Sequence, residues 1–201
     1  MPESNSISYP DSQEYISEAE ALAEKILSSG FECLHCGSCC KTEAGDSGLV
    51  MAGPDEIRAI ASRYGYSWED IAEPYPEVIT GRRGETFTIG WVLRRQHGRC
   101  RFSLPGTCEI YETRPWICMT YPFMLDGDRL VVFPCPGIGS PIAPDDARTL
   151  AENLIRRRIS ENKESEKVKQ CINRCAIPCG YFSVVDTDGL KTRDGFCYRS
   201  V

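Results

Sequence analysis

Histidine, long apolar runs and positive charge are all scarce in this sequence. Only two of its 201 residues are histidine, His35 and His97, which limits the number of mixed Cys/His zinc sites. No apolar run approaches the roughly 20 residues that a helix needs to span a bilayer. The N-terminal stretch MPESNSISYPDSQEYISEAE is acidic and polar and lacks the apolar core of a secretory signal. We therefore expect a cytoplasmic protein without a membrane span.

The charge balance is acidic, with a net charge of −6 and a pI near 5.1. Such a chain is a poor partner for nucleic-acid phosphates, so we expect no nucleic-acid binding. Two local basic clusters are expected to be solvated faces, docking surfaces for an acidic protein or, near cysteines, groups that offset thiolate charge. They comprise Arg94, Arg95, Arg99 and Arg101, and then Arg156, Arg157 and Arg158.

Helix signals are strong in the first third of the chain. One helix is expected to begin with the capping pair Asp11 and Glu14 and to end at Gly30. A second is expected from Pro54 to about Gly65. The apolar stripe of the first helix is expected to comprise Ile16, Ala19, Ala23 and Ile26.

The remaining pattern predicts a small, irregular α+β fold, mostly helical with short strands and organised around cysteine-ligated sites. Segments 85–96 and 129–134 are rich in β-branched and aromatic residues and are expected to be strands. A long packing helix is expected to begin near Pro144, before the charged stretch SENKESEKVK. The expected parts are an N-terminal helix at 1–30, a cysteine-cluster domain at 31–140, a packing helix and charged linker at 141–166, and a C-terminal four-cysteine segment at 167–201.

Twelve cysteines are several times more than a cytoplasmic chain of this length usually carries. A reducing compartment keeps thiols reduced, so metal or cluster ligation explains them better than disulfides. By position they form three sets of four, enough for three four-coordinate sites. The sets are Cys33, Cys36, Cys39 and Cys40; Cys100, Cys108, Cys118 and Cys135; and Cys171, Cys175, Cys179 and Cys197.

The first set lies in the run FECLHCGSCCK. Cys33-x2-Cys36-x2-Cys39 is a spacing by which one tight loop presents three thiolates to a cuboidal iron–sulfur cluster. Gly37 is expected to let the backbone approach the cluster and donate N–H bonds to its sulfides. Neighbouring side chains point in different directions, so Cys39 and Cys40 are expected to serve two adjacent sites, which the second set completes.

Zinc is the main alternative, because tetrahedral thiolate sites also use Cys-x2-Cys pairs and also stabilise small folds. Zinc sites more often contain two such pairs, whereas 7, 9 and 16 residues separate the cysteines of the second set. This difference favours iron–sulfur clusters, of the [4Fe-4S] kind, over zinc. His35 and His97 are expected to lie around a site or face solvent.

The third set has a different spacing, with three residues between each of its first three cysteines. Cys171 and Cys175 are one turn apart on an expected helix, a suitable geometry for two ligands of one site. A third cluster and a structural zinc site both remain open for this set.

Three segments together resemble a known family. They are FECLHCGSCC, CRFSLPGTCEIYETRPWICMTYPF and FPCPGIG, and they resemble the YkgJ-like cysteine-cluster proteins, a zinc- or iron-chelating domain with a CxxCxxCC signature. The resemblance covers roughly residues 31 to 140. Met119 stands where many members carry arginine. The matching positions of the second segment are Cys100, Cys108, Ile110, Tyr111, Arg114, Pro115, Cys118, Tyr121 and Pro122.

Four residues are expected to support the ligands. Tyr111 and Arg114 can direct a phenol and a guanidinium toward a thiolate-rich centre, and Pro115 fixes the chain before the next cysteine. Gly37 and Tyr121 complete this supporting set. Substrate binding by Tyr111 and Arg114 is the alternative.

The leading hypothesis is an iron–sulfur protein with two clusters on the first eight cysteines and possible room for a third on the last four. It would act in electron transfer, or as a redox accessory, with a protein redox partner or client. A zinc-binding structural or adaptor protein is the alternative. The resemblance also extends to flagellin lysine methylases, which implies a modification enzyme, although the chain has no Gly-rich nucleotide loop for a methyl donor.

Overall fold

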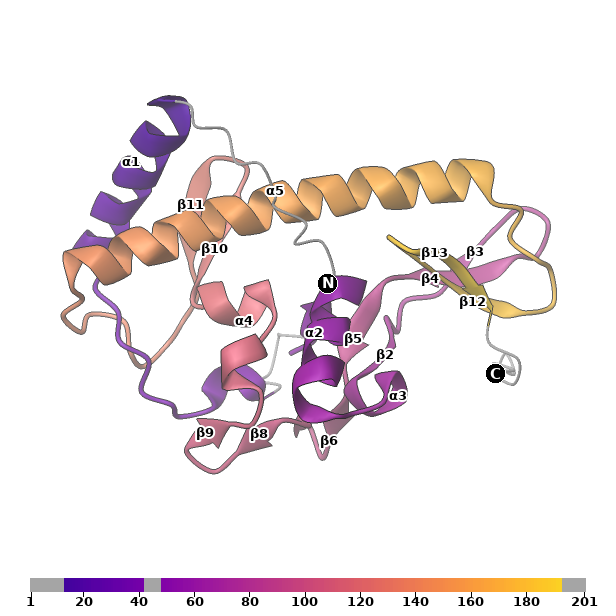
Figure 1. Ribbon diagram of the computed structural model, residues 1–201, viewed down its shortest axis with the longest axis horizontal. Coiled ribbons are helices and arrows are strands. Elements are labelled where there is room, and N and C mark those ends of the chain that lie inside the picture. Colours follow the sequence, from indigo (N-terminus) through magenta and orange to yellow (C-terminus); the bar gives the residue numbers. More distant parts are fainter. Residues whose placement is uncertain (1–12, 42–47, 193–201) are drawn as a thin grey trace.

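The computed structural model describes residues 13–41 and 48–192 and has an α+β architecture (Figure 1). The α+β class with short strands agrees with the expectation from the sequence, whereas its organisation around cysteine-ligated sites stays a prediction. Its α-helices are α1 (Gln13–Ser29), α2 (Pro54–Tyr64), α3 (Trp68–Ile71), α4 (Trp116–Thr120) and α5 (Pro144–Arg174), and two 3₁₀ turns are η1 (Ser38–Cys40) and η2 (Tyr111–Thr113). In the described parts of the chain, no helix combines the length and apolarity needed to cross a bilayer.

The strands are short and form several small sheets. The larger ones have the orders β13-β12-β4-β3 and β1-β5-β2, and three two-stranded pairs join β6 to β7, β8 to β9 and β10 to β11. Their bounds are β1 Met51–Ala52, β2 Ala72–Pro74, β3 Ile79–Thr80, β4 Thr86–Ile89, β5 Trp91–Leu93, β6 Arg95–Gln96, β7 Arg99–Cys100, β8 Ser103–Leu104, β9 Thr107–Cys108, β10 Phe123–Asp126, β11 Arg129–Val132, β12 Phe182–Asp186 and β13 Gly189–Thr192.

One hydrophobic core lies where α1 packs on the N-terminal half of α5, over the β10–β11 hairpin (Figure 1). Gly30 ends α1 with φ +62°, as the sequence indicated. The apolar stripe differs by one position from the expected one, because Leu22 is buried and Ile16 is 40% exposed. Asp11, the other half of the expected capping pair, lies outside the described residues. Beyond the helix, Phe31 forms an antiparallel bridge with Ile138.

The long helix α5 runs through the stretch that was expected to be a charged linker. Segment 160–169 is helical because Glu and Lys are good helix formers and because ion pairs one turn apart stabilise the exposed face. Lys169 pairs with Glu166 at 2.8 Å, and Arg148 and Arg156 both approach Glu152. The high content of charged residues in this segment therefore does not mark the end of the helix.

A second core surrounds β5, between α2, α3 and the end of β12. The strand expected at 85–96 is divided into β4, β5 and β6, because Gly90 adopts φ +77° and turns the chain between the first two. Parallel pairing of β12 with β4 builds the C-terminal segment into the same fold.

Candidate metal centre

The first three cysteines follow α1 in a loop that lies against the segment around Cys135. The N–H of Glu32 donates to the carbonyl of Gly137 at 3.1 Å. A Cβ at Gly137 would lie 2.0 Å from the carbonyl oxygen of Glu32, so only glycine permits this approach. Since Glu32 directly precedes Cys33 and Gly137 lies two residues after Cys135, the contact joins the two segments that carry these cysteines.

The loop then reverses direction before η1. His35 and Gly37 have φ values of +51° and +68°, and glycine adopts this left-handed backbone without strain. The sulfur of Cys36 lies 3.4 Å from the hydroxyl of Ser38, and hydrogen bonding with Ser38 lowers the pKa of Cys36. The exposed thiols of this loop are Cys33, Cys36 and Cys39.

Cys40 faces the other side of the turn, toward the second set. Lys41 forms an antiparallel bridge with the residue before Cys100. Ser103 of β8 hydrogen-bonds to the sulfur of Cys40, and Ser103 lies opposite Cys108 in the β8–β9 pair. Three cysteines from three segments thus converge.

Cys118 of α4 completes a set of mutually close thiols that we call the inner group: Cys40, Cys100, Cys108 and Cys118. All four are partly buried. Burial raises the pKa of Cys100 to about 11 and also raises the pKa of Cys108 and of Cys118. Repulsion raises these values further and acts in every pair: Cys118 with the other three, Cys100 with Cys40 and Cys108, and Cys108 with Cys40.

The remaining four cysteines of the first two sets form what we call the outer group: Cys33, Cys36, Cys39 and Cys135. Cys39 joins it to the inner group, because its sulfur lies 4.0 Å from that of Cys40. This contact raises the pKa of Cys39 and lowers that of Cys40, since a single negative charge is more stable on the pair than two. Cys39 also interacts electrostatically with Cys118 and Cys33.

Cationic side chains lie beside the inner group. Each lowers the pKa of one thiol and so opposes the effects of burial and repulsion. The pairs are Arg99 with Cys40, Arg95 with Cys100 and Arg114 with Cys108. Arg95 and Arg99 belong to the first basic cluster, and their position agrees with a role in offsetting thiolate charge. Arg94 and Arg101 of the same cluster form ion pairs with Glu73 and Asp70.

Tyr111 and Arg114 lie against each other near the inner group. The guanidinium carbon of Arg114 is 3.6 Å from the centre of the Tyr111 ring, and its Nη1 donates to the Tyr111 carbonyl at 3.1 Å. The exposed ring of His35 is 5.2 Å from that of Tyr111. These contacts join the cysteine loop to η2 through stacked side chains.

The hydroxyl of Tyr121 donates at 2.7 Å to the carbonyl of Pro134, directly before Cys135 of the outer group. This hydrogen bond fixes the segment that presents Cys135. His97 is exposed in the turn between β6 and β7, with φ +51°, in line with a solvent-facing histidine.

Glu56, in the first turn of α2, lies beside the inner group and was missed from the sequence. Its two carboxylate oxygens accept the N–H groups of Gly53 and Trp116, each at 2.7 Å. Burial raises the pKa of Glu56, and its charge is one of the groups that raise the pKa of Cys118. The sequence indicated only a first-turn acidic residue, and nothing in its pattern signals the contact with α4, 60 positions away.

The described cysteines of the third set lie at the C-terminal end of α5, apart from these groups: Cys171 is in its last turn, and Cys175 and Cys179 follow it. Arg157 contacts α4 through Thr120, and Cys171 is 14 residues further along the helix, or about 21 Å at 1.5 Å per residue. The sulfurs of Cys171 and Cys175 are 3.1 Å apart, and burial and this contact raise the pKa of Cys171 to about 11. Cys179 donates to the carbonyl of Arg83 at 3.3 Å.

The third set is described only in part, because Cys197 lies outside the described residues. Within residues 13–41 and 48–192, no three His, Cys, Asp or Glu side chains are arranged around a point that could hold a single ion. The inner and outer groups are therefore neighbourhoods of thiols, not closed coordination shells.

The raised pKa of Cys100 predicts a pH-dependent stability of the metal-free, reduced protein. Between its ordinary pKa near 9 and its folded value of about 11, the folded chain keeps a proton that the unfolded chain has lost. Ionisation then favours unfolding, so the stabilisation present below pH ~9 is lost as the pH rises to ~11. Urea midpoints at pH 8 and pH 10.5 measure this loss. A Cys100→Ala variant should show a shallower decline, and an equal decline in both proteins contradicts the prediction.

Comparisons with known proteins support this metal-binding interpretation. The family model CxxCxxCC, described as "Putative zinc- or iron-chelating domain", matches residues 32–171. The match extends beyond the segment 31–140 that carries the resemblance and takes in most of α5. Searches of curated proteins and of solved structures found no match. The chain belongs to the CxxCxxCC family of zinc- or iron-chelating cysteine domains.

Proposed function

We propose that this chain is a cytoplasmic iron–sulfur protein with two [4Fe-4S] clusters, one on the inner group and one on the outer group. The observation that carries the proposal is that each of the four inner thiols, which come from η1, β7, β9 and α4, interacts electrostatically with the other three. Four thiolates are the usual ligand set of such a cluster. A cluster between them would offset the repulsion that contributes to the raised pKa values of Cys100, Cys108 and Cys118.

The outer cluster would take three thiolates from the Cys-x2-Cys-x2-Cys loop and the fourth from Cys135. Gly37 and η1 place backbone N–H groups in this loop, and N–H bonds to cluster sulfur tune the reduction potential. The 4.0 Å contact between Cys39 and Cys40 would bring the two clusters close together.

Electron transfer suits this pair of sites. Three outer thiols are exposed and the inner ones are partly buried, so a protein redox partner could deliver one electron to the outer cluster, which would pass it to the inner one. No bond forms or breaks in such a step. The third cysteine set would hold a separate centre, which Cys197 would complete.

Metal and sulfide analysis of an anaerobically purified sample tests the proposal. Two [4Fe-4S] clusters require about eight iron and eight labile sulfide ions per chain, and a third raises both numbers to about twelve. Electron paramagnetic resonance of the reduced protein then counts the centres. Zinc without labile sulfide contradicts the proposal.

A structural zinc protein is the second candidate. It is favoured by the way in which the inner group connects four short segments, since a tetrahedral ion at this point would stabilise a region built from two-residue strands. This candidate predicts a colourless protein that unfolds when a chelator removes zinc. An oxygen-sensitive brown sample excludes it.

A further inference from the structure

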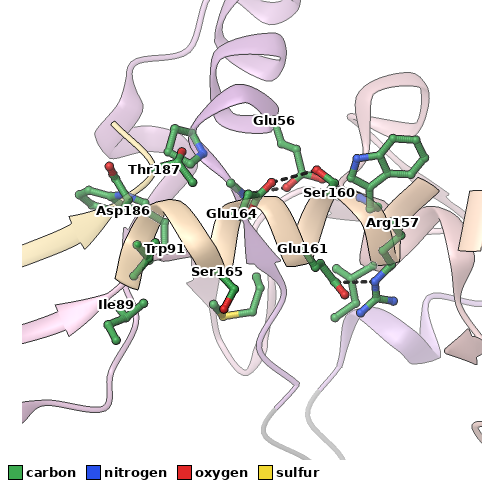
Figure 2. Close-up of a pocket in the computed structure, with 18 of the residues that line it drawn as sticks. Glu56, Ile89, Trp91, Arg157, Ser160, Glu161, Glu164, Ser165, Asp186 and Thr187 are labelled. Carbon is green, nitrogen blue, oxygen red and sulfur yellow. Dashed lines mark hydrogen bonds and ion pairs between the residues drawn. The ribbon is translucent and has the colours of Figure 1, made fainter. Parts of the chain in front are cut away.

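A cavity of about 510 Å³ lies beside the inner group, between the start of α2, α4, the C-terminal half of α5 and the ends of β5 and β12 (Figure 2). This volume falls within the range of small-molecule sites. Trp116 and Ile117 line it and directly precede Cys118. A ligand here would therefore contact the helix that presents an inner cysteine.

The walls of the cavity are largely apolar and aromatic. Its lining includes Trp91, Trp116, Ile117, Val168 and Ile172. Two indole rings and three aliphatic side chains suit an apolar stem, and an indole face also attracts an organic cation.

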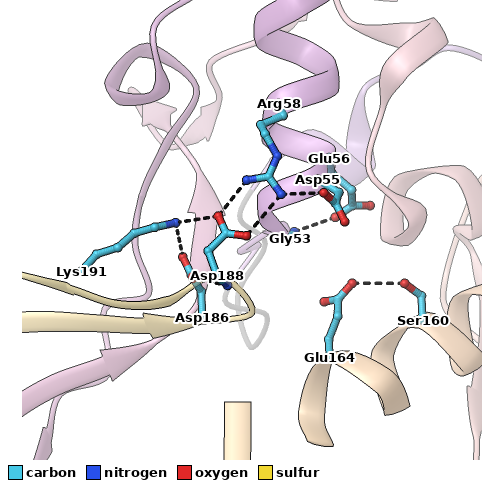
Figure 3. Close-up of polar contacts among 9 residues, drawn as sticks. All are labelled: Gly53, Asp55, Glu56, Arg58, Ser160, Glu164, Asp186, Asp188 and Lys191. Carbon is cyan, nitrogen blue, oxygen red and sulfur yellow. Dashed lines mark hydrogen bonds and ion pairs between the residues drawn. The ribbon is translucent and has the colours of Figure 1, made fainter. Parts of the chain in front are cut away.

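Two carboxylates meet in the wall of this cavity. Glu56 accepts the N–H of Gly53 at 2.7 Å. Glu164 lies over the same residue, since a Cβ at Gly53 would be 3.3 Å from each of its carboxylate oxygens. Figures 2 and 3 show Glu56 and Glu164 reaching toward each other from α2 and α5. Two carboxyl groups that interact electrostatically thus lie next to an apolar space.

The cations near the cavity are engaged elsewhere. Arg157 pairs with Glu161 at 2.6 Å and also donates to Thr120. Lys169 pairs with Glu166 at 2.8 Å. Among the residues that the structure describes, no Lys, Arg or His forms an ion pair with Glu56 or Glu164. The charge of Arg157 acts on Glu56 from a distance, but neither carboxyl group has a cation of the described residues as a direct partner.

The same region already shows how an ammonium group is held. The Nζ of Lys191 lies 2.6 Å from Asp186 (Figure 3). It is also 4.5 Å from the centre of the Trp68 ring and 5.6 Å from that of Trp91. Carboxylate and indole thus bind an ammonium together, and Trp91 and Asp186 also line the cavity. Glu56 and Glu164 with the nearby indoles repeat this chemistry without a cation from the described chain.

We propose that the cavity binds a primary alkylammonium ion. Its charged head would lie between Glu56 and Glu164, and its stem would lie along Trp91, Trp116 and Ile172. This site does not depend on which metal the cysteines hold, because its residues are separate from the thiol groups.

Calorimetric titration of the metal-loaded, full-length protein with hexylamine hydrochloride tests this site. 1-Hexanol has the same stem without the charge, and hexanoate has the opposite charge. Hexylammonium is expected to bind at least tenfold more tightly than 1-hexanol, and hexanoate is expected not to bind. Equal binding of hexylammonium and 1-hexanol, or no binding of hexylammonium, overturns the proposal.

A matched pair of variants on α5 tests whether the carboxylate of Glu164 binds the ammonium group. Glu164→Gln keeps the shape of the side chain and should weaken hexylammonium binding at least tenfold. Glu152→Gln removes a charge elsewhere on the same helix, where Glu152 pairs with Arg148 and Arg156 outside the cavity lining, and should change the affinity less than twofold. Equal weakening by both variants would indicate general electrostatics and would overturn the proposal. Metal content, measured on the same samples, separates this result from a failure of the cluster assignment.

Discussion

Replacing Cys40 by alanine is expected to remove the inner centre and leave the outer one, whereas replacing Cys39 should do the reverse. Cys40 interacts with all three other inner thiols, and Cys39 follows the loop that carries Cys33 and Cys36. Adjacent side chains diverge, so each cysteine supplies a different centre. Iron and labile sulfide should fall by about half in each variant, with a different electron paramagnetic resonance signal lost in each.

The denaturation midpoint should also differ between the Cys39→Ala and Cys40→Ala variants. The inner group connects four segments of the fold, so loss of its centre is expected to lower the denaturation midpoint more than loss of the outer centre. Cys171→Ala is the control, because its thiol lies with that of Cys175 at the C-terminal end of α5, and both centres should remain. Loss of all iron in both the Cys39 and the Cys40 variant would contradict the division into two centres.

The second large effect is expected from Gly137→Ala. The added Cβ would lie 2.0 Å from the carbonyl oxygen of Glu32, a backbone atom that no side-chain rotation can move away. Relief requires the two segments to separate, which removes the hydrogen bond from Glu32 to Gly137 and moves Cys33 away from Cys135. We expect loss of the outer centre and destabilisation by about 3 kcal/mol, from overpacking and the lost hydrogen bond together.

Gly65→Ala provides the comparison for this variant. Gly65 has φ +74° at the end of α2, and a Cβ there would meet no atom within 4 Å. The substitution should cost about 1 kcal/mol through backbone strain and leave iron content unchanged. Urea unfolding with iron and sulfide analysis measures both variants. Full iron content in Gly137→Ala would show that the close approach of the two segments is not needed for the outer centre.

Local signals in the sequence were sufficient for α1, for α2 and for the start of α5, but they did not predict α4. Gly30 and Gly65 end α1 and α2 with left-handed backbone, and Pro54 and Pro144 begin α2 and α5. Strands were harder, because a two-residue strand such as β7 contains no period to detect. The charged stretch 160–169 was mistaken for a linker, since Glu- and Lys-rich sequence suits both a solvated loop and an exposed helix.

The candidate site was likewise predicted only in part. Spacing alone suggested that Cys39 and Cys40 point to different partners, and the structure places Cys40 among Cys100, Cys108 and Cys118. Glu56 gave no functional signal, because a first-turn glutamate is common in helices and its contact with Trp116 crosses 60 positions. No local pattern in the sequence predicted the cavity beside α4, because its lining residues come from segments far apart in the chain.

By itself, the sequence determined that the protein is rich in thiol ligands, that the first eight cysteines carry the family signature, and that helices flank them. Those properties depend on residue type and on spacing along the chain. Only the tertiary structure decided which remote thiols are neighbours and that Glu56 and Glu164 face one cavity. Both depend on contacts between segments far apart in the sequence, such as the approach of Glu32 to Gly137. Such contacts form through packing of the whole chain, which no local window of residues specifies.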